Sequence, residues 1–212
     1  MRDTKENILL TALFLFAQNG YDAVSVSDIA GQLGMTKGAL YRHYRNKRAI
    51  FDAIVERMER LDSERALQYE LPVEVLSPTA EQSYRETDID QILRFSQAQF
   101  HYWTQEEFPT AFRKMLTLEQ FRNEEMSRLY QQYLVSGPLG YLTDLFRARN
   151  LSDAAERAAM LYGAMFLFYG IYDGADDKST TVSAWEAYLK KLSDTWESGD
   201  FPASHNKKAK KA

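Results

Sequence analysis

The sequence contains no cysteine, only three histidines and no long apolar run, and each absence excludes a class of protein. Without cysteine there is neither a disulfide framework nor thiolate chemistry. His43, His101 and His205 do not form a metal-spaced cluster. No stretch approaches the roughly 20 apolar residues of a membrane span, and charged residues at positions 2–6 are unlike a secretory signal. We therefore expect a cytoplasmic protein without a membrane partner, a metal or another cofactor.

The local patterns that many enzymes need are also missing. There is no phosphate-binding glycine loop and no nucleophile elbow. Asp173, Asp176 and Asp177 form the tightest group of carboxylates, but they flank Gly174 in a predicted turn, where acidic residues are common. Their spacing does not match the calcium loop D-x-D-x-D-G. These absences argue against an enzyme.

Acidic residues are absent from one particular stretch, between Ile29 and Phe51. The net charge of the whole chain is −4, yet this stretch carries Lys37, Arg42, Arg45, Lys47 and Arg48. Two of these lysines fall in predicted first turns of helices, where the helix dipole disfavours a cation. A cation there makes sense beside an anionic partner, because helix N-termini bind phosphate. The alternative is a solvated basic face with no partner.

The pattern of residues 25–47 predicts two short helices joined by a tight turn. Ser25 and Asp28 form a near capping box for the first helix. Gly34 lies where a helix end favours the left-handed conformation, and Thr36 then caps the second helix. Leu40 and Tyr44 direct one face of that second helix toward a core. Two helices of this kind, the second basic and aromatic outside, indicate a helix-turn-helix.

Residues 4–58 resemble the DNA-binding domain of the TetR-type transcriptional regulators. The matching segments are ILLTALFLFAQNGYDAVSVSDIA and GMTKGALYRHYRNKRAIFDAI, about a quarter of the chain. The rest resembles the family only in its helical pattern and its length. The resemblance implies that the helix starting at Lys37 enters the major groove of a double-stranded DNA operator. One short recognition helix reads few base pairs, so we expect a homodimer on a near-palindromic site.

Three kinds of DNA contact are expected from this resemblance. Small residues at the turn allow close approach to base edges, and Ala39 could touch a thymine methyl group. Arg42 could contact guanine or only the backbone. The remaining candidates are phosphate contacts, which fix register without reading sequence. The full set of DNA-binding candidates is Ser25, Thr36, Lys37, Gly38, Ala39, Tyr41, Arg42, His43 and Lys47.

The fold class expected for the whole chain is all-α. The N-terminal domain, 1–47, has three helices including the helix-turn-helix, and 48–70 is a connecting helix. The C-terminal helical domain, 71–200, is expected to bind an effector and to dimerise, and 201–212 is expected to be a disordered lysine-rich tail. Apolar periodicity and breaks predict helices over 4–19, 47–70, 88–103, 106–122, 123–135, 138–149, 152–173 and 180–197, with a loop over 71–87.

The middle of the chain is rich in aromatic residues and methionine, with a few polar groups among them. Such a mixture suits a cavity for a small organic ligand, which in the family typically releases the protein from DNA. Taken singly, each aromatic residue is better explained as ordinary core. The ligand-binding candidates are Phe95, Gln99, Tyr102, Phe112, Met115, Tyr133, Tyr162 and Phe166.

The last two predicted helices carry more apolar residues than one amphipathic face requires. The family usually pairs these helices as a four-helix bundle between two chains. Alternatively, Phe168, Tyr172 and Trp196 only complete the core of a single chain. The dimerisation candidates are Ala158, Phe168, Tyr169, Tyr172, Trp185, Leu189 and Trp196.

The function expected is that of a ligand-responsive, dimeric, sequence-specific transcriptional regulator, and more specifically a repressor. A second hypothesis is a DNA-binding protein with no small-molecule effector, controlled by a protein partner or acting architecturally. A ligand-induced rise in melting temperature would separate the two.

Overall fold

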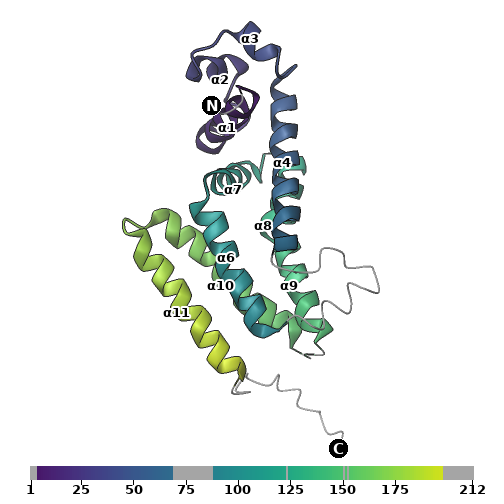
Figure 1. Cartoon of the computed structure of the whole chain (residues 1–212), viewed down its shortest axis with the longest axis vertical. Coiled ribbons are helices and arrows are strands. Elements are labelled where there is room, and N and C mark those ends of the chain that lie inside the picture. Colours follow the sequence, from purple (N-terminus) through teal and green to yellow (C-terminus); the bar gives the residue numbers. More distant parts are fainter. Residues whose placement is uncertain (1–3, 69–87, 123, 150, 152, 198–212) are drawn as a thin grey trace, which may run out of the picture.

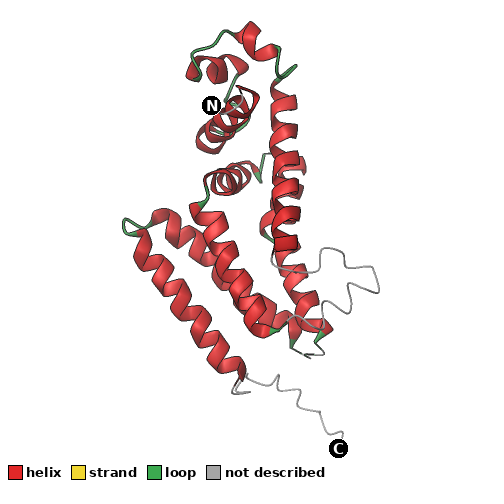
Figure 2. Ribbon diagram, viewed as in Figure 1, coloured by secondary structure: helices red, strands yellow, loops and turns green. Residues whose placement is uncertain are grey.

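The computed structural model describes residues 4–68, 88–122, 124–149, 151 and 153–197, and these ranges contain helices and no strand (Figure 2). The all-α prediction is confirmed. No helix within these ranges has the length and apolar character needed to cross a membrane. The helices are α1 (Thr4–Asn19), α2 (Val26–Gln32), α3 (Lys37–Tyr41), α4 (Lys47–Gln68), α6 (Ile89–Gln105), α7 (Glu107–Glu119), α8 (Glu124–Leu134), α9 (Ser136–Ala148), α10 (Ala154–Gly174) and α11 (Lys178–Glu197).

The predicted caps of the helix-turn-helix are present. Ser25 Oγ accepts the backbone N–H of Asp28 at 3.2 Å, and the Asp28 carboxylate accepts the N–H of Ser25 at 2.7 Å, which completes a capping box. These hydrogen bonds lower the pKa of Asp28. Thr36 Oγ1 accepts the N–H of Ala39 at 3.2 Å, and Gly34 adopts a φ of 63°. Local chemistry therefore determines where both helices begin and where the first one ends.

The break predicted between the helices 123–135 and 138–149 is present, but it lies at Val135 rather than at Gly137 and Pro138. Helix α9 begins at Ser136, so both residues lie in its first turn, where the missing N–H of proline has no helical partner to lose. A Cβ on Gly137 would lie 1.9 Å from the carbonyl oxygen of Gln132, so close packing of the α8–α9 turn requires glycine. The predicted loop 71–87, the predicted cap Ser152 and the tail 201–212 lie outside the described residues.

The three short N-terminal helices form one end of an elongated molecule, and α4 runs from that end along its length (Figure 1). Asn46 caps α4, because its Oδ1 accepts the N–H of Ala49 at 2.8 Å. Helix α7 packs on α1, and α10 packs on α6, α9 and α11. Thus α4 and α7 both join the N-terminal end to the body.

A buried carboxylate fixes the turn after α1 to the end of α7. Glu119 is fully buried and accepts the N–H of Tyr21 at 2.9 Å, while Arg122 lies 3.3 Å from the same carboxylate oxygen. Gly20 has a φ of 84°, and a Cβ there would lie 2.6 Å from Arg122 and 2.7 Å from Glu119. The Tyr21 ring also packs edge-on against Phe51, with centroids 5.3 Å apart. The turn therefore cannot move independently of α7.

The acidic group near the end of α10 has a structural role at Asp173. Arg113 on α7 is buried and donates two hydrogen bonds to the Asp173 carboxylate, at 2.8 and 2.9 Å. Burial alone would raise the pKa of Asp173, but the hydrogen bonds and charge of Arg113 lower it. The pair ties α7 to α10.

Two phenylalanines near α7 provide a matched test of this packing. Phe112 is fully buried, whereas Phe121 is 90% exposed. We expect Phe112→Ala to lower the free energy of unfolding by about 3–5 kcal/mol, because it removes a buried ring and leaves a cavity. Phe121→Ala should change it by less than about 0.5 kcal/mol. Urea denaturation followed by circular dichroism measures both, and equal effects would contradict this packing.

Candidate functional site

The second helix of the helix-turn-helix turns one side inward and the other outward. Leu40 and Tyr44 are buried, whereas Tyr41 is 43% exposed and Arg42 and His43 are exposed. Helix α3 ends at Tyr41 rather than continuing to Tyr44 as predicted. The division between core face and solvent face is the predicted one, so the polar candidates can reach a partner.

The five cations of the acid-free stretch are not equivalent. The guanidinium of Arg48 donates hydrogen bonds to Asp52 at 2.6 Å and to Glu125 on α8 at 2.7 and 2.6 Å. The Lys47 amine donates to the carbonyl of Tyr21 at 2.8 Å and lies over its ring. Both positive charges are therefore already engaged within the chain.

The other cations project from the surface. Arg42 and Arg45 are exposed and form no hydrogen bond or ion pair with any residue that the structure describes. Lys37 is exposed too and lies 5.7 Å from the centroid of the Tyr41 ring. These side chains can contact an anion without breaking an internal interaction. Arg45 was not among the predicted contacts, although its position in the acid-free stretch could have indicated it.

Among the remaining candidates, Ser25 and Thr36 use their hydroxyl oxygens as helix caps, which leaves each O–H able to donate to a partner. A Cβ added to Gly38 would meet no atom within 4 Å. The free protein therefore has room for a Cβ at Gly38, and its own packing does not require glycine there. Ala39 beside it is partly buried.

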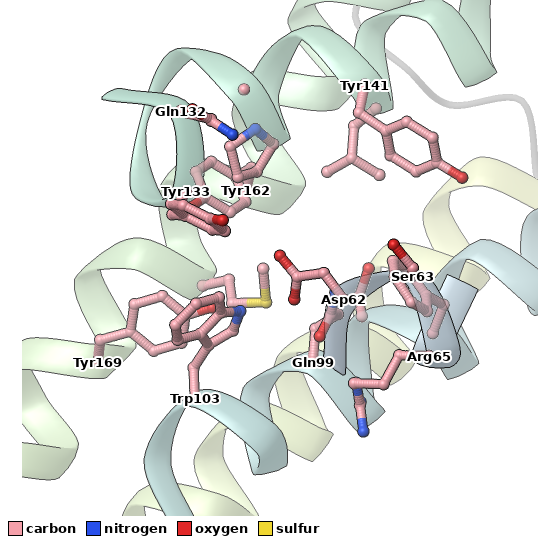
Figure 3. Close-up of a pocket in the computed structure, with 16 residues that line it drawn as sticks. Asp62, Ser63, Arg65, Gln99, Trp103, Gln132, Tyr133, Tyr141, Tyr162 and Tyr169 are labelled. Carbon is pink, nitrogen blue, oxygen red and sulfur yellow. The ribbon is translucent and has the colours of Figure 1, made fainter. Parts of the chain in front are cut away.

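A cavity of about 320 Å³ lies between α4, α6, α8, α9 and α10 (Figure 3). Its walls are mainly aromatic and apolar, and its polar groups are few, as in many small-molecule sites. The apolar and aromatic lining residues are Phe95, Trp103, Tyr133, Gly137, Pro138, Tyr141, Leu142, Tyr162, Met165 and Tyr169. The polar and charged lining residues are Asp62, Ser63, Arg65, Ser96, Gln99 and Gln132.

Half of the predicted ligand-binding residues meet in this cavity, namely Phe95, Gln99, Tyr133 and Tyr162. The other four are not among its lining residues. Phe112, Met115 and Tyr102 are buried in the core, where the Tyr102 ring lies under the Arg65 guanidinium at 4.0 Å. Phe166 is on the outer face of α10. Apolar character alone did not distinguish lining from core.

Two charged cavity residues on α4 were missed. The carboxylate of Asp62 points into the open space opposite Tyr133 and Tyr162, and Arg65 turns away from it (Figure 3). Burial raises the pKa of Asp62 to about 7, although the charge of Arg65 lowers it. A sequence signal existed, because Asp62 continues the four-residue spacing of the buried Ile54 and Met58.

The predicted dimerisation residues lie mostly inside the chain. Ala158, Tyr169, Trp185, Leu189 and Trp196 are buried, and Phe168 and Tyr172 are partly buried. The selection of the five buried residues is therefore corrected: they pack α10 and α11 onto the body of their own chain, as the alternative had it for Trp196. A role of Phe168 and Tyr172 in dimerisation stays a prediction.

The face of α10 that remains exposed is a different apolar stripe. It repeats every three to four residues and includes two exposed glycines. The stripe consists of Met160, Gly163, Phe166, Leu167, Gly170 and Ile171. Contiguous exposed apolar surface of this kind marks an interaction site.

Comparisons with known proteins agree with the N-terminal arrangement. Residues 8–54 match the family model described as bacterial regulatory proteins, tetR family. The chain is 38% identical over 69 residues to the HTH-type transcriptional regulator AcrR of Shigella flexneri, covering 32% of each chain. It is 38% identical over 52 residues to IcaR of Staphylococcus epidermidis, a negative transcriptional regulator of the biofilm operon icaADBC, covering 24% of this chain and 28% of IcaR.

A solved structure extends the similarity of fold to most of the chain. The SmeT–triclosan complex superposes with a TM-score of 0.61 at 18% identity, covering 90% of this chain and 91% of SmeT. By contrast, this chain spans about a third of the length of the curated relatives that it matches in sequence. The sequence similarity is thus concentrated in the helix-turn-helix, and the body shares its fold.

Asp62 makes the stability of the protein depend on pH. The pKa of this carboxyl is about 7 in the folded chain and about 4 when unfolded, so the folded state binds more protons between these values. The free energy of unfolding should therefore fall, relative to that of Asp62→Asn, by up to about 1.4 kcal/mol per pH unit from pH ~4 to ~7. Above pH ~7 the difference should stay constant. Urea denaturation at each pH measures it, and parallel curves for the two proteins would contradict this environment.

Proposed function

We propose that this chain is a sequence-specific DNA-binding transcriptional repressor, and that a small organic ligand releases it from its operator. The proposal starts from residues 8–54, through which the chain belongs to the tetR family of bacterial regulatory proteins. The observation that carries the proposal is the exposed basic surface at α3, where Lys37, Arg42 and Arg45 project without internal ion pairs among the described residues. DNA presents a dense row of phosphates that such cations contact. The repressor role follows IcaR, a negative regulator.

The helix-turn-helix would dock with α3 in the major groove. The N-terminal ends of α2 and α3 would contact phosphates through Ser25, Thr36 and Lys37, with Tyr41 and His43 beside them. The open space around Gly38 would lie against the base edges. Lys47 and Arg48 would contribute mainly by orienting α4, because their charges are engaged within the chain.

The exposed stripe of α10 supports a homodimer. Its four large apolar side chains would be buried against the same surface of a second chain, and Gly163 and Gly170 would allow the helices to approach closely. Such a self-complementary contact has twofold symmetry. Two copies of α3 would then read the two halves of a near-palindromic operator.

The cavity supports control by a ligand, and α4 offers a route for it. One end of α4 holds the turn after α1 through Lys47, and the other end lines the cavity with Asp62 and Arg65. Helix α7 holds the same turn through Glu119. In one arrangement of the dimer, the two copies of α3 would no longer match the spacing of the operator halves. A ligand that binds more tightly to that arrangement would release the DNA.

The second hypothesis, a DNA-binding protein without an effector, predicts that the cavity stays empty. Its volume of about 320 Å³ lies at the lower end of the range for small-molecule sites, which favours an effector. The SmeT–triclosan complex is similar in fold and holds a ligand. A rise in melting temperature with an added ligand would exclude the second hypothesis.

Selection of genomic DNA fragments by the purified protein tests the central proposal. At about 150 mM salt, near physiological ionic strength, we expect enrichment of a short near-palindromic sequence. The fragment can then be tested for release by candidate ligands. Enrichment of nothing above random DNA, with ligand-stripped and refolded protein, would overturn the proposal.

Salt dependence tests the basic surface. Arg45→Ala should reduce the slope of log K against log salt concentration by about one per half-site, because each lost phosphate contact releases one counterion fewer. Arg60→Ala is a matched control, since Arg60 is exposed on α4 but about 20 Å along the helix from its first residue. Fluorescence anisotropy with a labelled fragment measures both slopes. An unchanged slope for Arg45→Ala would remove that residue from the interface.

The stripe on α10 is tested by Leu167→Glu. Leu167 is 64% exposed, so a glutamate is tolerated in a single chain, but it would be a buried charge in the dimer. We expect the wild type to be a dimer and Leu167→Glu a monomer by sedimentation equilibrium at micromolar concentration. Phe121→Glu, at an exposed position outside the stripe, should remain dimeric. A dimeric Leu167→Glu would move the interface elsewhere.

A further inference from the structure

Asp62 is a carboxylate without a partner at the centre of the cavity. Figure 3 shows its oxygens directed into the open space rather than toward Arg65. It forms no hydrogen bond or ion pair with any residue in the described ranges. Arg65 instead donates to the carbonyl of Ala98 at 3.1 Å and lies 3.7 Å from Glu106. Arg65 therefore forms no ion pair with Asp62, although its charge lowers the pKa of that carboxyl.

Apart from the Nε atom of Arg65, two further buried polar atoms of lining residues lack hydrogen-bond partners among the described residues. The side-chain oxygen of Gln99 and the hydroxyl of Tyr133 are buried, and neither forms a hydrogen bond within the described part of the chain. Buried polar atoms usually have a partner, so each unpaired atom requires an explanation. Together with Asp62, these atoms offer a carboxylate, an amide oxygen and a hydroxyl, all of which can accept a hydrogen bond. A ligand group with several N–H donors would satisfy them together.

The rest of the cavity wall suits the apolar part of such a ligand. Trp103, Tyr133, Tyr141, Tyr162 and Tyr169 contribute rings from four helices. The faces of aromatic rings attract cations, especially where water is excluded. A protonated amine on an aromatic or aliphatic body would therefore meet complementary groups on every side.

An anionic ligand fits these contacts less well. A carboxylate in the cavity would face Asp62. The two terminal nitrogens of Arg65 are directed to Ala98 and Glu106 and its guanidinium lies over Tyr102, so only its buried Nε–H is not used in these contacts. A neutral hydrogen-bond acceptor would need Asp62 to carry a proton. A neutral acceptor therefore requires Asp62 to be protonated, whereas a cationic ligand requires Asp62 to be ionised.

We propose that the effector is an organic cation: a protonated amine that pairs with Asp62 while its apolar body packs on the aromatic wall of the cavity. This inference rests on the proposed function for the consequence of binding, though not for binding itself. In this proposal Asp62 determines the preference for a positive charge, and the surrounding rings determine which apolar body fits the cavity.

Three probes on one scaffold test the charge preference: 4-phenylbutylamine, 4-phenylbutan-1-ol and 4-phenylbutyrate. Isothermal titration calorimetry with the full-length, ligand-stripped protein at pH 8 should show the amine binding at least tenfold more tightly than the alcohol, and the carboxylate binding most weakly. Asp62→Asn should abolish the preference. Glu64→Gln makes the same charge change at an exposed position on α4 outside the cavity, and it should keep the preference.

A second readout needs no variant. The titratable groups around Asp62 are Arg65 on its own helix and tyrosines from the helices packed against it. Burial raises the pKa of four of these above the ordinary value of about 10, so they are neutral near pH 7: Tyr102, Tyr133, Tyr162 and Tyr169. Since the pKa of Asp62 is about 7, its ionised fraction rises about tenfold from pH 6 to pH 8. The amine stays protonated over this range, so its affinity should rise about tenfold, with release of a proton.

Each outcome is decisive. Equal affinity of amine and alcohol, preference for the carboxylate, or an affinity that falls from pH 6 to pH 8 would overturn the organic-cation proposal. So would failure of all three probes to bind a protein that still binds its DNA fragment. If the amine binds through Asp62 but leaves the protein on DNA, the cation site stands and the proposed release by a ligand fails.

Discussion

The unbroken backbone hydrogen bonding of α4 is the constraint on which the rest of the structure depends. Its 22 residues span about 33 Å. Lys47 at one end holds the turn beside the helix-turn-helix, and Asp62, about 22 Å farther along, reaches the cavity. Because a helix of this length resists bending, the proposed binding of a ligand at Asp62 would displace the helix-turn-helix end of α4 rather than be absorbed locally.

The N-terminal helices are attached to the body by a second connection besides α4. Glu119 at the end of α7 holds the same turn that Lys47 holds, and Arg48 reaches across to Glu125 on α8. The N-terminal helices are thus fastened to two elements of the body at once. A change in the orientation of the N-terminal helices would therefore involve both α4 and α7, and coupled packing of this kind favours two discrete arrangements over a continuous range.

The helix-turn-helix could be predicted from the sequence because its signals are local. The caps at Ser25 and Thr36, the left-handed Gly34 and the inward pair Leu40 and Tyr44 each act within four residues. The cavity and the outer stripe could not be predicted in the same way. Helix α10 is apolar nearly all round, so only tertiary packing decides that Tyr169 faces the cavity and Phe166 the solvent. Asp62 was missed, but it could have been predicted, since a carboxylate that continues an apolar stripe is visible in the sequence.

The empty space around Gly38 has a genetic consequence. A Cβ introduced there would meet no atom within 4 Å in the free protein, so a chain with alanine at this position would fold and accumulate normally. If two chains act together on one operator, such a chain would still pair with a normal one, and the mixed dimer would have only one functional helix-turn-helix. An allele of this kind would be dominant over the wild type, whereas alleles that disrupt the core would be recessive.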